Sequence, residues 1–114
     1  MEITRLAGAA VGRSRAVAWE GLAFAVATAG HLGDDLKAQT AATLAQIEQN
    51  LADAGSDKSR ILQATVYLAD ITRKAEMDEV WNDWIGDGDW PQRACVGVQL
   101  APGDLVEIVV VAAR

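Results

Sequence analysis

The chain has 114 residues, of which 51% are hydrophobic and 23% are charged. This length suits one hydrophobic core, so we expect residues 1–114 to form a single domain. Sixteen acidic residues against ten basic ones give a net charge of −6. That balance disfavours attraction to phosphate backbones, and nucleic acid is therefore not an expected partner.

The sequence also disfavours membranes and metals. No continuous apolar run approaches the roughly 20 residues that span a bilayer. The N-terminus has no basic stretch followed by an apolar block, so a secretory signal is not expected and we predict a cytoplasmic protein with no membrane partner. One cysteine and one histidine do not fit the usual zinc spacings, and no calcium-loop motif occurs, so no metal is expected.

The first third of the chain reads as short strands. We expect strands over residues 3–8, 15–21 and 22–29, with Glu20 and Gly21 in a hairpin turn between the last two. From Asp34 the apolar spacing becomes helical, and acidic residues at the start and Gly55 at the end suit the two ends of a helix.

A strand, a second helix and two more strands follow. We expect a strand over 59–70, a helix over 74–85 that buries Trp81 and its apolar neighbours on one side, and a break at the two glycines and the proline of 86–91. Strands over 93–100 and 105–113 then flank a turn at 101–104.

This order predicts an α+β fold in which two helices pack on one face of a mixed β-sheet. In the last strand, Val106, Ile108 and Val110 alternate with Val109 and Val111, so both faces of the sheet are apolar there. Two helices cover only one face, and soluble monomers rarely expose a large apolar patch. We therefore expect a second subunit to cover the other face.

Arg93 is the first candidate site residue. Alternation along its strand places Arg93 and Cys95 on one face and the apolar residues Ala94, Val96 and Val98 on the other. The apolar set suits the core under the helices, which assigns Arg93 to the subunit interface. An arginine buried there needs an anion, either a protein carboxylate or a ligand carboxylate held by its planar fork.

Glu107 is the only charged residue in the last strand. An isolated buried carboxylate is costly, so a salt bridge between Arg93 and Glu107, or another structural pairing of these residues, is one interpretation. The register of the 91–113 hairpin decides whether the two side chains share a face, because a shift of one residue moves a side chain to the other face.

Other residues have both an ordinary and a functional interpretation. Cys95 has no neighbouring histidine or lysine to activate it and is better read as a small buried residue than as a nucleophile. Trp90 is the one tryptophan that suits the lining of a site, and His31 is a loop histidine that could flank a pocket. Arg13 precedes the second strand and has ordinary surface charge as its simplest interpretation.

Several motifs resemble the reactive-intermediate deaminase family (RidA, also called YjgF-like), and its YoaB-like branch in particular. They are the helix from Gln39 to Leu51, the ATVYLAD strand, the Met77…Trp81…Trp84 helix, the P-x-R-x-C of 91–95 and the VEI of 106–108. The resemblance implies a chorismate-mutase-like homotrimer with sites between subunits. It further implies hydrolysis of reactive 2-imino or enamino acids to 2-keto acids and ammonia, as by 2-iminobutanoate/2-iminopropanoate deaminases, without metal or cofactor.

The resemblance also implies residue roles. Arg93 grips the carboxylate of a small imino or keto acid, backbone groups near Cys95 contact the ligand, and Glu107 holds the attacking water. The chain departs from the pattern at two places: GRSRAV has Arg13 or Ser14 where the family usually has a tyrosine, and Gly30 and His31 match the family Gly-Gln only with an insertion. Two alternatives stay open, a non-catalytic ligand-binding protein and, disfavoured by the acidic charge, an endoribonuclease or translation inhibitor.

Overall fold

The computed structural model describes residues 2–30 and 32–114. Its elements, in chain order, are β1 Ile3–Ala7, β2 Ser14–Trp19, β3 Leu22–Thr28, α1 Leu36–Asp53, η1 Lys58–Arg60, β4 Ile61–Leu68, η2 Ile71–Arg73, α2 Lys74–Ile85, β5 Gln92–Gly97 and β6 Val106–Ala113. The expected strands and helices are thereby confirmed. The strand expected over 93–100 is shorter, and two single 3₁₀ turns precede β4 and α2.

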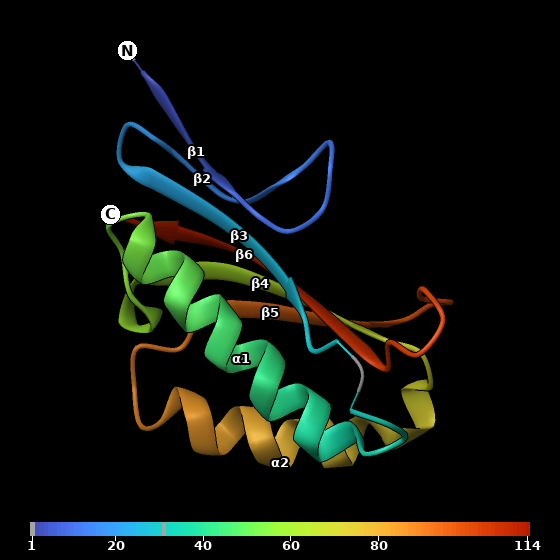
Figure 1. The fold of residues 1–114 in the computed structure, drawn as a ribbon. Helices are drawn as coiled ribbons and strands as arrows, with labels where there is room; N and C mark the ends of the chain where they lie inside the picture. Colours follow the sequence, from blue (N-terminus) through green and yellow to red (C-terminus); the bar gives the residue numbers. More distant parts are fainter. Residues whose placement is uncertain (1, 31) are drawn as a thin grey trace.

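The strands form one six-stranded sheet in the order β1-β2-β3-β6-β4-β5 (Figure 1). β2 and β3 form the expected hairpin, with Glu20 in the turn at a φ of 54°. β4, α2 and β5 form a crossover unit in which the two strands are parallel. The prediction that the two strands of residues 91–113 form a hairpin is therefore wrong. β6 lies between β3 and β4, and β4 separates β6 from β5.

Both helices lie on one face of the sheet, as the sequence predicts (Figure 1). The core between the helices and the sheet contains Leu44, Ile47 and Leu51 of α1 together with Ile108 and Val110 of β6. Small residues occupy the core positions of β2 and β3 and let α1 approach the sheet closely: Ala16, Ala18, Ala23, Ala25 and Ala27.

The ends of α1 follow from its sequence. Asp35 is the N-cap residue and accepts a hydrogen bond from the backbone N–H of Ala38 at 3.0 Å. After the helix, Gly55 has a φ of 86°, a conformation that residues with a side chain rarely adopt. These features set the length of α1 and the direction in which the chain enters η1 and β4.

The opposite face of the sheet carries exposed apolar side chains. Phe24 of β3 and Val109 of β6 are 38% and 37% exposed, and Val96 of β5 is 41% exposed. The expectation of a second apolar face on the last strand is confirmed, because Val106, Ile108 and Val110 are buried under the helices while Val109 is not. Exposed apolar side chains on one face of a sheet favour association with another chain.

Candidate functional site

Arg93 is a residue of β5, and its side chain packs against α2. Its Nη2 donates a hydrogen bond to Oδ1 of Asp78 at 2.6 Å, and its guanidinium carbon is 5.1 Å from the ring centroid of Trp81. The Arg93 side chain is 19% exposed and that of Asp78 is 27% exposed. The ion pair and the cation–π contact together offset the cost of burying this arginine.

The face on which Arg93 lies differs from the sequence prediction. Arg93 and Cys95 face the helices, whereas Val96 and Val98 lie on the uncovered side and are 41% and 42% exposed. The prediction was wrong because it assigned the apolar side chains of β5 to the core. β5 is an edge strand, and α2 supplies a carboxylate and an indole that accommodate the arginine.

Cys95 is partly buried next to the core. Burial raises the pKa of its thiol, although Arg93 nearby partly opposes that shift. A raised pKa leaves less thiolate at neutral pH, so the side chain has the character of a small buried residue and not of a nucleophile.

Glu107 lies on the uncovered face. It pairs in register with Thr28 of β3 and Tyr67 of β4, and its sequence neighbours Val106 and Ile108 are both buried on the helix side. The carboxylate is half-buried among the side chains of this face. It therefore points away from the core and toward the apolar surface that includes Val109.

Arg93 and Glu107 do not meet in one chain. Arg93 pairs in register with Ala64 on β4, whereas Glu107 pairs with Tyr67 on the same strand, and the two side chains lie on opposite faces of the sheet. The predicted salt bridge between Arg93 and Glu107 is therefore wrong within one chain. The alternative prediction, another structural pairing, holds for Arg93, which pairs with Asp78. A site that uses both residues requires two copies of the chain.

The remaining candidates fall at the two ends of the sheet. Gly30 follows β3 two residues beyond the Thr28–Glu107 pair, and Arg13 precedes β2 at the same end. Trp90 precedes β5 at the opposite end, where its Nε1 donates to the carbonyl oxygen of Gly86 at 2.9 Å and its surface is 72% exposed. His31 lies outside the described residues.

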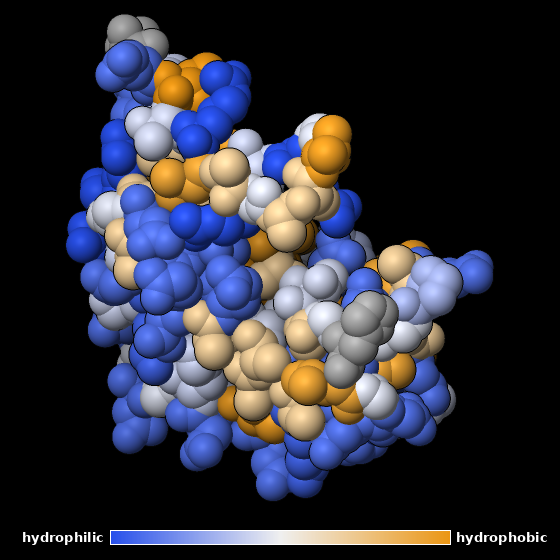
Figure 2. Space-filling model, viewed as in Figure 1, coloured by the Kyte–Doolittle hydropathy of each residue, from blue (hydrophilic) through white to orange (hydrophobic). Residues whose placement is uncertain are grey.

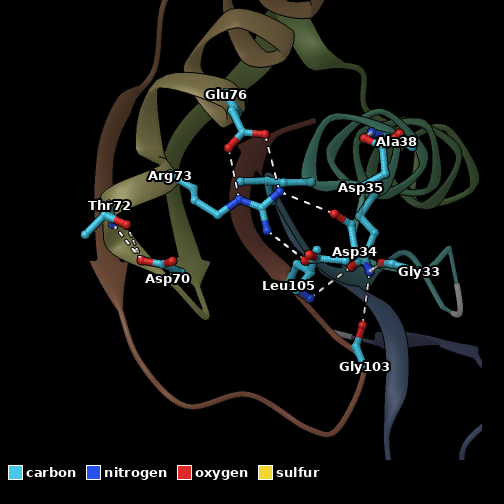
Figure 3. A network of polar contacts seen from close by, with 12 residues as sticks. Gly33, Asp34, Asp35, Ala38, Asp70, Thr72, Arg73, Glu76, Gly103 and Leu105 are labelled. Atoms are coloured by element: carbon cyan, nitrogen blue, oxygen red, sulfur yellow. Dashed lines mark hydrogen bonds and ion pairs between the residues drawn. The ribbon is translucent and has the colours of Figure 1, made fainter.

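Gln39 ties the loop after β3 to the loop before β6. Its Nε2 donates to the carbonyl oxygens of Gly33 and Gly103 at 2.8 and 3.0 Å, and its Oε1 accepts from the N–H of Leu105 at 2.9 Å. Figure 3 shows these three backbone groups converging from the two loops. Buried Gln39 thereby fixes the position of the loop that carries Gly30 relative to the start of the Glu107 strand.

Arg73 forms a second tie at the same place. It bridges Glu76 at 2.9 Å and Asp34 at 2.9 Å, and Figure 3 shows its guanidinium between the two carboxylates. These hydrogen bonds, those to Glu76 first, raise the pKa of Arg73. The loop after β3 is thus attached to both α1 and the start of α2.

Two surface hollows of the chain are not lined by any candidate residue. One, of about 370 Å³, lies along the outer side of α1 and is lined by Ala41, Ala45 and Trp84, among others. Figure 2 shows a mostly hydrophilic surface on this side, interrupted by apolar residues over α1. Another, of about 360 Å³, lies against Gly33 and Leu105. Among residues 2–30 and 32–114, no three His, Cys, Asp or Glu side chains cluster so as to hold a metal ion.

Two residues near Arg93 were missed by the sequence reasoning. Lys74 donates to Oδ2 of Asp78 at 2.7 Å, so Lys74, Asp78 and Arg93 form a continuous polar cluster. The signal that could have revealed it is the spacing of Lys74 and Asp78, four residues apart on a predicted helix, together with the parallel pairing that a strand-helix-strand unit requires.

Comparison with known proteins gives the family. A family model described as Endoribonuclease L-PSP matches residues 7–114. The RutC family protein YoaB of Escherichia coli K12 is 45% identical over 84 residues, which cover 73% of this chain and 74% of that protein. The chain belongs to the RidA/YjgF family, and to its YoaB-like branch.

Solved structures of RidA/YjgF proteins have the same fold. A YjgF family protein from Neisseria meningitidis is 40% identical to this chain and superposes on it with a TM-score of 0.92. The match covers 100% of this chain and 96% of that protein. A member of the YjgF/YER057c/UK114 family from Mycobacterium tuberculosis is 32% identical, with 99% and 100% coverage and a TM-score of 0.88. The expected family and its α+β fold are thereby confirmed.

As for membranes, no helix in the part of this RidA/YjgF chain that the structure describes is long and apolar enough to cross one.

Proposed function

We propose that the protein is a homotrimeric enamine/imine deaminase that hydrolyses reactive 2-imino acids to 2-keto acids and ammonia. The site lies between subunits, where Arg93 of one copy and Glu107 of another face the same ligand. The placement of these two residues on opposite faces of a sheet with one apolar, uncovered face supports this most directly. Two copies are needed to bring the residues together, and the apolar face favours the association.

The guanidinium of Arg93 suits a carboxylate anchor. Asp78 accepts from Nη2, and Nη1 donates to the sulfur of Met77 at 3.7 Å. Within residues 2–30 and 32–114, no hydrogen bond joins Nε or Nη1 of Arg93 to an oxygen, so these donors are left for a ligand carboxylate. The Trp81 ring beneath the guanidinium restricts its movement and holds it ready for a ligand.

The chemistry needs little more than positioning. Glu107 accepts a proton from a water molecule as the water oxygen forms a bond to C2 of the protonated imine. The resulting tetrahedral intermediate carries a hydroxyl and an amino group. Glu107 then returns the proton to the nitrogen, the C2–N bond breaks to release ammonia, and the hydroxyl proton passes to Glu107 as the keto group forms. The imine is already electrophilic, so orientation and one acid-base group suffice, and no covalent nucleophile is required.

A non-catalytic ligand-binding protein is the second candidate. Two observations favour it: Arg13 lies in the stretch where the resemblance implies a tyrosine, and Asp78 already engages Arg93. An endoribonuclease, the activity named in the family description, is disfavoured by the net charge of −6.

The deciding experiment couples the protein to an amino-acid dehydratase that releases an imine and follows trapping of that imine by semicarbazide. We expect the wild type to speed imine loss, Glu107→Gln to abolish that effect while still binding 2-keto acids, and Arg93→Ala to lose both. If the wild type binds keto acids without accelerating imine loss, the non-catalytic alternative is correct. Full activity of Arg93→Ala would disprove the anchor role.

A further inference from the structure

Asp78 places a carboxylate beside the donors of Arg93 that are left for a ligand carboxylate. Its Oδ1 is 2.6 Å from Nη2 of Arg93, and its Oδ2 is 2.7 Å from Nζ of Lys74. The side chain is 27% exposed, so it is accessible from the same side as the guanidinium. A ligand anion that binds the remaining donors of Arg93 therefore lies close to a second negative charge.

Asp78 is ionised in the folded protein. Burial opposes its ionisation, but hydrogen bonds from Lys74 and Arg93 outweigh burial, and the pKa of the carboxyl lies below its ordinary value. Two carboxylates that share one guanidinium repel each other, and this repulsion weakens binding of a simple anion. A cationic nitrogen next to the ligand carboxylate removes the conflict, because Asp78 can accept a hydrogen bond from it.

We propose that Asp78 is a specificity residue that selects zwitterionic 2-imino or 2-amino acids over anionic 2-keto acids. The inference rests on the proposed role of Arg93 as carboxylate anchor. In the imine, the protonated nitrogen is bonded to C2, one bond from the carboxylate carbon, and lies toward Asp78 when the carboxylate is on Arg93. After hydrolysis the nitrogen has left, the product is a plain anion, and repulsion by Asp78 favours its release.

The test uses two stable ligands with the same carbon skeleton, 2-aminobutanoate and 2-oxobutanoate. Their dissociation constants are measured by calorimetry on the wild-type chain, on Asp78→Asn and, as a control, on Asp83→Asn, because Asp83 is an exposed residue of the same helix. We expect the wild type to prefer the amino acid. Asp78→Asn should shift the ratio of the two constants toward the keto acid by about tenfold, since one charge contact is lost. Asp83→Asn should not change the ratio, and Asp78→Glu should restore the preference.

The outcomes distinguish failure of this inference alone from failure of the proposed function. If both ligands bind and the ratio is the same in wild type and Asp78→Asn, the selection by Asp78 is disproved while Arg93 remains the anchor. If the wild type binds the keto acid as tightly as the amino acid, the inference also fails, and this result does not depend on the folding of any variant. If neither ligand binds the wild type, the proposed function fails and the inference fails with it.

Discussion

Arg93 and Glu107 lie on opposite faces of the same β-sheet. Arg93 points to α2, where it pairs with Asp78, and Glu107 points to the uncovered apolar face. Because side chains alternate along a strand, no rotamer change brings the two groups to one small ligand within a single chain. A site that used both residues would therefore need two copies of the chain, and each prediction below tests one part of this proposal.

Gln39 should contribute strongly to stability because it satisfies three backbone groups from two loops. Gln39→Leu preserves the approximate size of the side chain but leaves these buried groups without a partner. We expect the free energy of unfolding in urea to fall by about 2–4 kcal/mol. Gln49→Leu is the control, since Gln49 is exposed on the same helix and donates a hydrogen bond to Asp53; its effect should stay within about 0.5 kcal/mol. Equal effects of the two substitutions would contradict the role of Gln39.

Val109 tests the association surface. It is 37% exposed at the centre of the uncovered face, between β3 and β4. Val109→Lys places a charge on that apolar surface, and we expect the variant to sediment near the chain mass of 12.1 kDa while the wild type sediments as a larger species. Ala45→Lys, on the exposed side of α1, should leave the assembly intact. A wild type that is itself monomeric would rule out a shared site.

Asp78 should make stability depend on pH in acid. Its pKa is lowered in the folded chain, so its ionised form adds stability above the unfolded pKa of about 3.9, and this stability is lost as the pH falls through the lower folded value. At pH 6 we expect Asp78→Asn to be less stable than the wild type by about 1 kcal/mol, a modest figure because the pair is partly exposed.

The same comparison at about pH 2 should show a smaller difference in unfolding free energy, because protonation of Asp78 removes the charge that Asn lacks. Both proteins are measured at the same protein concentration, because assembly makes apparent stability depend on concentration. A gap that stayed constant from pH 6 to pH 2 would show that the ion pair with Arg93 does not stabilise the fold.

The sequence was sufficient for most of the fold, because local signals agree with the final structure. Asp35 and Gly55 mark the ends of α1, and the alternation of Ile108 with Val109 identifies the two apolar faces of β6. Strand order was harder to predict. The prediction of a hairpin over residues 91–113 was wrong because the APGD segment resembles a hairpin turn, whereas the order β4, α2, β5 favours parallel pairing of β5 with β4.

The environment of Arg93 could not be predicted from alternation alone. That argument assumes that the core accepts apolar side chains and rejects charged ones, and it fails where a neighbouring element supplies a counter-charge. Asp78 and Trp81 of α2 do so, and they make the helix side of β5 the lower-energy place for the guanidinium. The alternation of side chains along a strand does not tell which helix residues will pack against that strand, because this depends on the tertiary structure.

Activity in mixed assemblies tests the shared site most directly. Arg93→Ala and Glu107→Gln should each be inactive in imine hydrolysis as pure proteins. When the two variants are co-expressed, some sites pair the intact Arg93 of one copy with the intact Glu107 of another. For random mixing in a cyclic oligomer, about one quarter of the sites are complete, so about one quarter of wild-type activity should return.

The control co-expresses two differently tagged copies of Arg93→Ala, which should stay inactive. Recovery of activity only in the mixed Arg93→Ala and Glu107→Gln assembly is the result expected from residues on opposite faces of one sheet. If the mixed assembly forms, as shown by co-purification through both tags, and has no activity above that of the pure variants, the site is not shared between copies.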